Sequence, residues 1–198
     1  MEIVREFKSN DKVLKIVRDE SPESPREWDN LTKMIFFGNY RHLGEKHDFI
    51  KNQSFNSRDE FIVEGENILR KEIKDIAICY PVHLYNHDGV SISIDYEYPY
   101  TVRWDSGTIG FCIITKEDIR KNWGIKNVTK KYIQHADEIL RSEINTLDNY
   151  ISGEVYGFII EDEDGNHIDS CFGFYGFDIK TNGMLEYIQD EEFANQLI

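Results

Sequence analysis

The stretch that decides the fold is residues 129–174, TKKYIQHADEILRSEINTLDNYISGEVYGFIIEDEDGNHIDSCFGF. Its first half repeats apolar residues at helical spacing and ends at a glycine, so the pattern predicts a helix over 129–152. Its second half has two apolar segments, 155–160 and 168–174, which flank the turn-forming residues 162–166 and predict a β-hairpin. A long helix followed by a hairpin indicates a mixed fold.

The same signals recur on both sides of this stretch. Strands are predicted at 2–7, 13–18, 32–37, 76–85, 90–95 and 108–114, with 32–37 as a central strand, and 38–56 is interpreted as a long loop. Helices are predicted at 57–74, 115–124 and 185–196, because Ser57 and Thr115 are suitable N-caps. Strands outnumber helices and most connections look like hairpins. The sequence therefore predicts an α+β fold, a largely antiparallel sheet with helices packed mainly on one face.

Composition indicates one domain in a reducing compartment. The chain has 198 residues, four prolines and no linker-like segment, so residues 1–198 are predicted to form a single domain. No apolar run approaches the roughly 18–20 residues needed to span a bilayer, and the charged N-terminus lacks a signal-peptide core. Three widely spaced cysteines form no zinc pattern and are interpreted as buried thiols. We therefore expect a cytoplasmic protein.

The net charge of −14 is distributed unevenly. Residues 1–131 contain 21 Lys and Arg against 22 Asp and Glu, whereas residues 132–198 contain 2 against 15. Such a surface repels nucleic-acid phosphates and attracts strongly basic surfaces. Three interpretations follow: the acidity provides solubility only, it serves to bind a basic protein, or it serves to bind cations.

Motifs for several common enzyme chemistries are missing. There is no Walker loop, no dinucleotide-binding glycine pattern, no nucleophile elbow and no HExxH sequence. The acidic turn at 161–166 lacks the twelve-residue calcium-loop pattern and is interpreted as a solvated turn. We therefore expect no cofactor and no resident metal.

Two Trp-Asp segments have the densest mixture of functional groups. Residues 24–30, SPREWDN, combine a guanidinium, two carboxylates, an amide and an indole, and residues 104–107, WDSG, repeat the Trp-Asp pair. The favoured interpretation is that they anchor loops through a buried tryptophan and a capping aspartate. The alternative is a small metal-assisted enzyme acting on a nucleotide or nucleic acid. Its cleft would draw on Asp29, His47, His83 and Asp105.

Five segments together resemble a known family. They are SPREWDNL (24–31), LGEKHDF (43–49), WDSG (104–107), GEVYGF (153–158) and DSCFGFYG (169–176). They resemble an uncharacterised family of small proteins of bacteriophages, prophages and plasmids, over about residues 20–176. The family brings no agreed activity and no catalytic residues. The resemblance implies a setting, because small acidic proteins of mobile elements often block host restriction or CRISPR machinery, sometimes as DNA mimics.

Charge and setting together favour a non-enzymatic interference protein in the cytoplasm of a bacterial host. Its expected partner is a basic, nucleic-acid-binding defence protein, with no direct nucleic-acid contact and no membrane association. The residues expected to form the partner surface are Asp137, Glu138, Glu161, Asp162, Glu163, Asp164, Asp190, Glu191 and Glu192. A virion assembly module is a third possibility, supported only by the suspected source.

Overall fold

The computed structural model describes residues 1–48, 55–87, 89–94, 99 and 105–197. The chain divides into two compact units, which we describe separately: unit 1 is Met1–Pro25 with Asn149–Ile198, and unit 2 is Arg26–Asp148. Each unit has its own four-stranded antiparallel sheet, and the predicted α+β class is confirmed. Compact units are not by themselves independently folding domains, so the single domain over 1–198 stays a prediction.

Unit 1 is built on two hairpins that pair through their inner strands. The sheet order is β1 (Ile3–Ser9), β2 (Lys12–Arg18), β7 (Val155–Asp162) and β8 (His167–Tyr175). Both hairpins were predicted from their alternating strands and turn residues. The pairing of β2 with β7, which joins the two ends of the chain in one sheet, was not predicted.

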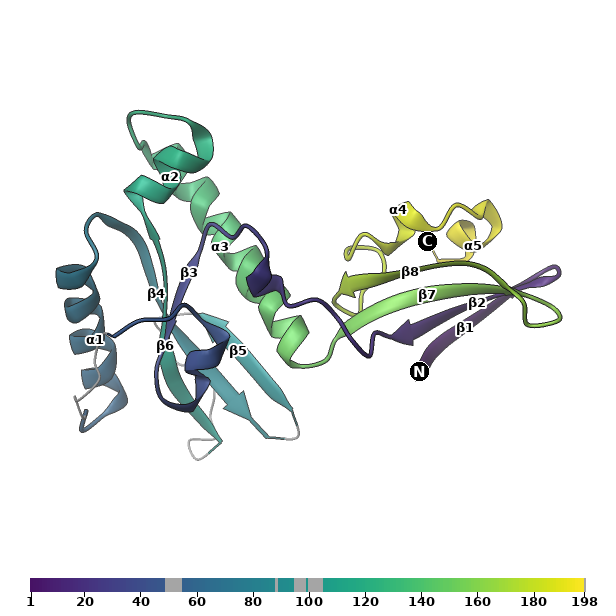
Figure 1. The fold of residues 1–198 in the computed structure, drawn as a ribbon, viewed down its shortest axis with the longest axis horizontal. Coiled ribbons are helices and arrows are strands. Elements are labelled where there is room, and N and C mark those ends of the chain that lie inside the picture. The colour runs from purple at the N-terminus through teal and green to yellow at the C-terminus, as the bar shows by residue number, and fades with distance from the viewer. Residues whose placement is uncertain (49–54, 88, 95–98, 100–104, 198) are drawn as a thin grey trace. The chain divides into compact units, whose positions relative to one another are not determined.

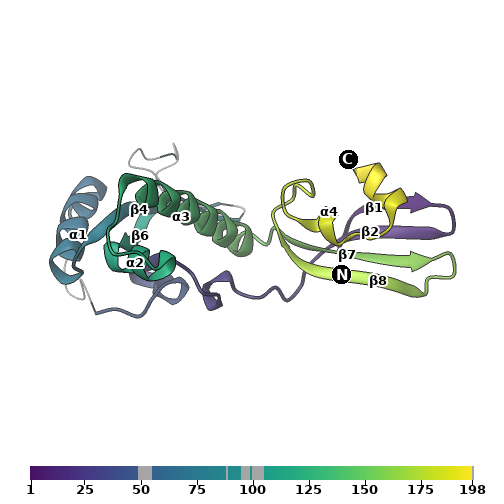
Figure 2. The same ribbon diagram turned by 90° about the horizontal axis from the view of Figure 1, so that it is seen from above.

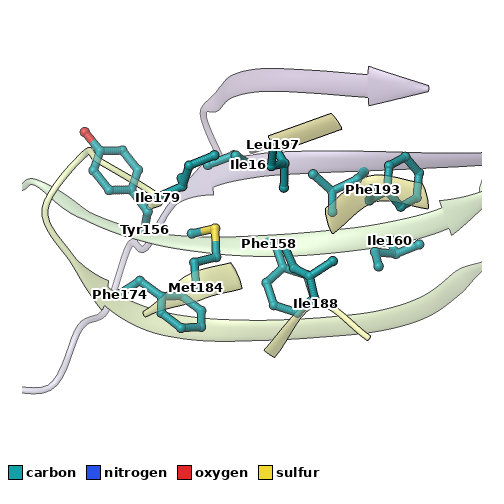
Figure 3. Close-up of a cluster of buried hydrophobic side chains, with 11 residues drawn as sticks. Ile16, Tyr156, Phe158, Ile160, Phe174, Ile179, Met184, Ile188, Phe193 and Leu197 are labelled. Atoms are coloured by element: carbon teal, nitrogen blue, oxygen red, sulfur yellow. The ribbon is translucent and has the colours of Figure 1, made fainter. Parts of the chain in front are cut away.

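Helices cover one face of this sheet, as Figures 1 and 2 show. They are α4 (Met184–Tyr187) and α5 (Glu191–Leu197). The single helix predicted over 185–196 was wrong, because Ile188 is extended and Asp190 begins a new helix by accepting the Phe193 N–H at 3.4 Å. The core beneath the helices (Figure 3) consists of Leu14, Ile16, Tyr156, Phe158, Ile160, Phe174, Ile179, Met184, Ile188, Phe193 and Leu197.

Phe172 lies on the opposite face of the unit 1 sheet, over Gly157. A Cβ atom at Gly157 would lie 2.3 Å from the Phe172 ring, so the glycine provides the space that the ring occupies. Gly157 also pairs with Val17, which pairs with Ile3, so these four residues form one row across the sheet. The alternation of aromatic and small residues in DSCFGFYG therefore reflects packing within this unit.

Unit 2 has the sheet order β3 (Lys33–Phe36), β6 (Ser106–Thr115), β4 (Ile76–Asn86) and β5 (Val90–Ile94). The hairpin of β4 and β5 was predicted, although Asp88 in its turn lies outside the described residues. The prediction that 32–37 forms a central strand was wrong, because β3 is an edge strand. Residue Glu45 covers its outer side, since both the N–H and the carboxylate of Glu45 bond to the Met34 backbone.

Two helices pack on opposite faces of this sheet (Figure 1). The helix α1 (Arg58–Glu72) packs on the face that contains Cys79, and α3 (Lys130–Ile151) contacts the neighbouring Tyr80 through Arg141. A third helix, α2 (Lys116–Trp123), directly follows β6. Two 3-10 turns, η1 (Pro25–Glu27) and η2 (Gly38–Leu43), precede and follow β3. No helix of the described residues is long and apolar enough to cross a membrane.

Local capping explains where the helices begin and end. The Ser57 hydroxyl accepts the Glu60 N–H at 3.1 Å, and Thr115 forms a capping box with Asp118. The helix α2 ends at Gly124, whose φ of 62° is a left-handed conformation that favours glycine. The predicted helices at 57–74, 115–124 and 129–152 are therefore confirmed. The loop predicted over 38–56 contains η2, and its residues 49–54 lie outside the described part.

The close approach of β3 and β6 depends on Gly110. A Cβ atom at this position would lie 2.1 Å from the Ile35 carbonyl oxygen and 2.8 Å from the Phe36 Cα. Both are backbone atoms, which cannot move aside as a flexible side chain can. Gly107, in the same strand, has open space at the corresponding point.

We expect Gly110→Ala to lower the free energy of unfolding by about 1–3 kcal/mol or more, because the methyl group forces two strands apart. Urea unfolding followed by circular dichroism measures this effect. The matched control is Gly107→Ala, which should change stability by less than about 0.5 kcal/mol. Equal stability of the two variants would contradict the close approach.

Candidate functional site

Most of the net negative charge belongs to unit 1. This unit has 17 Asp and Glu against 6 Lys and Arg, a net charge of −11 over 75 residues. Unit 2 has 20 against 17, a net charge of −3 over 123 residues. The division is less sharp than the one in the sequence, where residues 132–198 alone have a net charge of −13, because residues 132–148 belong to unit 2 and the first 25 residues belong to unit 1.

Much of this charge collects at one end of the unit 1 sheet. Lys12 pairs with Asp162, so the β1–β2 and β7–β8 turns lie at the same end, as both ribbon views show (Figures 1 and 2). Asp190 joins them, because its carboxylate lies 3.0 Å from the Lys12 Nζ atom. We call this region the acidic end, and its residues are Asp11, Glu161, Asp162, Glu163, Asp164 and Asp190.

Two lysines hold the acidic end together. Lys12 binds Asp190 at 3.0 Å, and Lys15 binds Glu161 at 2.5 Å across the β2–β7 pairing. Both lysines are about a quarter to two fifths exposed, so the pairs are partly shielded from solvent. They neutralise part of the charge that the sequence analysis assigned to the partner surface.

The tip of the acidic end is a well-defined turn. The Asp162 carboxylate accepts the backbone N–H of Asn166 at 2.7 Å and its side-chain amide at 2.8 Å. These hydrogen bonds lower the pKa of Asp162, so this carboxylate keeps its charge in mildly acidic solution. Glu163 and Asp164 follow Asp162 in this turn, both are exposed, and neither forms an ion pair with a described residue.

The remaining predicted partner residues lie elsewhere or outside the described side chains. Asp137 and Glu138 lie on α3, in unit 2, where Asp137 binds Arg141 at 2.9 Å and Glu138 accepts a hydrogen bond from Gln134. The side chains of Glu191 and Glu192 lie outside the described part of the chain. The structure thus brings together five of the nine predicted residues: Glu161, Asp162, Glu163, Asp164 and Asp190.

Asp29, the first residue of the alternative catalytic cleft, lines a polar pocket of about 270 Å³. Its other lining residues are Asn30, Leu31, Lys33, Asp118, Lys121 and Asn122. Asp118 receives two hydrogen bonds from the Lys33 Nζ atom, at 2.8 and 2.9 Å. Burial opposes ionisation of this carboxyl, but the hydrogen bonds from Lys33 and Thr115 outweigh burial and lower the pKa of Asp118.

The other three cleft candidates do not join Asp29. His47 bonds through Nε2 to the Phe36 carbonyl at 2.7 Å, and His83 is completely buried against Thr108. Asp105 precedes β6 and binds His87 at 3.0 Å, whereas the pocket of Asp29 lies beside Asp118, which follows the same strand. A ten-residue strand spans roughly 30 Å. The structure therefore does not assemble these four residues in one cleft, and the described residues include no group of three metal-ligating side chains.

The Trp-Asp segment at 24–30 has a structural role. Arg26 binds Glu45 at 2.5 Å and the Thr32 carbonyl at 3.1 Å, and the carboxylate of Glu143 accepts the N–H groups of Leu31 and Thr32. The favoured interpretation named a tryptophan and an aspartate as the anchors, whereas the anchoring contacts of this segment are those of Arg26. That interpretation is wrong in naming a buried tryptophan here, since Trp28 is 42% exposed, and Trp104 lies outside the described residues.

The sequence analysis missed Glu143 and Asp148 of α3. The Asp148 carboxylate accepts the Ile92 N–H at 2.7 Å, and burial raises its pKa. These contacts join residues 56 to 112 positions apart. No local pattern marks such partners, because each carboxylate looks like any other acid on the polar side of an amphipathic helix.

We expect Asp118→Asn to lower stability at neutral pH by about 1–2 kcal/mol, because it removes the charged partner of Lys33 and weakens the α2 cap. The folded-state pKa of Asp118 lies below the ordinary value of 3.8, so its contribution is present above pH 3.8 and is lost as pH falls through the folded value. Thermal unfolding of both proteins between pH 3 and 7 tests this. A difference in melting temperature between the two proteins that does not shrink toward pH 3 would contradict this prediction.

Comparison with known proteins adds no identification. No protein-family model, no curated protein and no solved structure matches the chain. The resemblance to the mobile-element family therefore stays a prediction, and the functional proposals below depend on the geometry and charge of the two units.

Proposed function

We propose that unit 1 binds a basic surface of a nucleic-acid-binding protein and that the acidic end is its principal contact. The observation that supports this most is the collection of five predicted acids, from the β7–β8 turn and the start of α5, at one end of one sheet. Contact with such a surface would occupy the site that phosphates otherwise use. The protein would then act by occupancy and not by turnover.

The energetics of the acidic end suit this role. A unit with a net charge of −11 attracts a basic partner over a distance of about 10 Å at moderate salt, which speeds encounter. Glu163 and Asp164 are exposed and form no ion pair with a described residue, so binding costs little rearrangement of existing pairs. The rigid Asp162–Asn166 turn presents them in one conformation, which reduces the entropy lost on binding.

The finer proposal concerns the setting. The resemblance to proteins of phages, prophages and plasmids favours a host defence enzyme, of the restriction or CRISPR type, as the partner. The chain would then be an interference protein with a DNA-mimicking surface. The enzyme alternative has less support, because its four candidate residues lie apart in unit 2.

We expect the purified chain to release fluorescein-labelled duplex DNA from a sensitive restriction or CRISPR nuclease at about one molecule per site. Raising the salt concentration should weaken the effect, because exposed charges are screened. The variant Glu163→Lys with Asp164→Lys should weaken inhibition about tenfold or more, since each reversal replaces attraction with repulsion. Fluorescence anisotropy across a panel of such nucleases measures both effects.

The matched control is Glu64→Lys with Glu72→Lys, two exposed acids on α1 whose reversal changes the net charge equally. It should inhibit as well as the unmodified chain. Equal loss in both variants would show that only total charge matters, and no loss in either would exclude the acidic end as the contact. Inhibition far below one molecule per site would instead indicate an enzyme.

A further inference from the structure

Six cationic side chains gather where α2 turns into α3. They are Lys116, Arg120, Lys121, Lys126, Lys130 and Lys131, within sixteen consecutive residues that contain only two acids, Glu117 and Asp118. We call these six residues the basic corner. All but Arg120 are exposed. A net charge of +4 over sixteen residues is unusual in a chain with 37 acids.

No member of the basic corner forms an ion pair with a described residue. Elsewhere most cations of the chain are paired, as Lys12, Lys15 and Arg18 are in unit 1 and Lys33 and Arg141 are in unit 2. The two acids nearest in sequence form no ion pair with the corner, because Asp118 is bound to Lys33 and the Thr115 cap and Glu117 forms no ion pair with a described residue. The corner thus presents its charge to solvent.

A ring contact and a hydrogen bond order the connection between α2 and α3. The rings of Trp123 and Tyr132 lie 5.6 Å apart and join the end of α2 to the first turn of α3. Arg120 donates through Nε to the Lys126 carbonyl at 3.2 Å, which ties the connecting segment to α2. The six cations therefore lie on two helices and an ordered connection, α2, the start of α3 and the segment between them, which Figures 1 and 2 show side by side.

The start of α3 adds positive potential to the corner. A helix N-terminus has a partial positive charge and ordinarily favours acidic residues. The first turn of this 22-residue helix contains no acid and begins with Lys130 and Lys131. Both lysines therefore stand where charge is unfavourable for the helix, and a bound anion would relieve the repulsion.

We propose that the basic corner binds the phosphate backbone of nucleic acid without reading its sequence. Six unpaired cations and a helix N-terminus provide the groups that recognise phosphate. The prediction of no direct nucleic-acid contact was drawn from the acidic surface expected for residues 132–198. That reasoning applies to unit 1, whereas the corner belongs to unit 2, whose net charge is only −3. The proposal does not depend on the function proposed for unit 1.

An acidic protein surface, such as the acidic end of a second copy, is a less suitable partner. Five of the six cations are lysines, and lysine is depleted from the centres of protein interfaces. None of the large exposed apolar side chains of the molecule lies between residues 116 and 131, so the corner lacks an apolar contact centre. Phosphate contacts need no such centre, because they are made by flexible charged side chains.

Fluorescence anisotropy with a labelled duplex of about 20 base pairs, and with one of its strands, tests the proposal at about 50 mM salt. We expect binding to both probes that weakens as salt rises. Lys130→Glu with Lys131→Glu should weaken binding at least about tenfold and reduce the slope of log K against log salt by about 2. These substitutions place acids in the first turn of α3, where they favour the helix, so the melting temperature should not fall.

The matched control is Lys71→Glu with Lys74→Glu, two exposed lysines in or just after α1 that change the net charge equally. It should bind like the unmodified chain. Absence of binding to either probe, or equal loss in both variants, would overturn the proposal. Self-association in the absence of the probes, measured by light scattering, would also overturn the proposal if neither probe binds and two double variants abolish the association. These variants are Lys130→Glu with Lys131→Glu and Glu163→Lys with Asp164→Lys. The basic corner would then bind the acidic end of a second copy.

Discussion

The antiparallel pairing of β2 with β7 is the constraint on which unit 1 depends. It aligns Lys12 with Asp162 and Arg18 with Tyr156, residues that are about 140 to 150 positions apart. Two separate hairpins would each be marginal in water. Joined, they form a four-stranded sheet that can bury one apolar core beneath α4 and α5. The same pairing brings two turns to one end and so creates the acidic end.

Carboxylates serve two distinct purposes in this chain. In unit 2, Glu45, Glu143 and Asp148 are used up as hydrogen-bond acceptors for backbone amides of neighbouring segments. In unit 1, by contrast, acids outnumber the available cations almost three to one, and those at the β7–β8 turn remain exposed. Net charge alone does not distinguish these purposes. The two purposes are distinguished by whether a backbone amide or a cation lies next to the carboxylate.

Local sequence patterns predicted most helices and strands correctly, but they did not predict which strands pair with each other. The helical spacing in 129–152, the cap at Ser57 and the Asp-Gly hairpin each depend on interactions within a few residues, so the sequence states them directly. The division of eight strands between two sheets depends on contacts more than 100 residues apart, which no window of sequence contains. The edge position of β3 was missed for a different reason, because Glu45, only 11 residues from Met34, shields a strand whose apolar sequence is typical of a central strand.

The candidate site shows the same division. The run at 161–164 was recognisable as an acidic turn, but Asp190 joins it only through Lys12. The cleft predicted around Asp29 and Asp105 is not formed, because Asp105 precedes β6 whereas Asp29 lies beside Asp118, which follows the same strand. Similar composition does not indicate spatial proximity. The basic corner was present in the sequence as a run of lysines and was hidden by averaging the charge over a longer segment.

The pair of hydrogen bonds that the Glu143 carboxylate accepts from the N–H groups of Leu31 and Thr32 has a consequence for biosynthesis. It joins residues near the start of unit 2 to α3, which ends unit 2. Once unit 2 has folded, the loop that must close for β2 to pair with β7 is therefore shorter. Unit 2 is continuous and emerges from the ribosome whole, whereas unit 1 waits for its last strands. Unit 2 would thus fold before unit 1, and the most highly charged surface would form only after β7 and β8 have been synthesised.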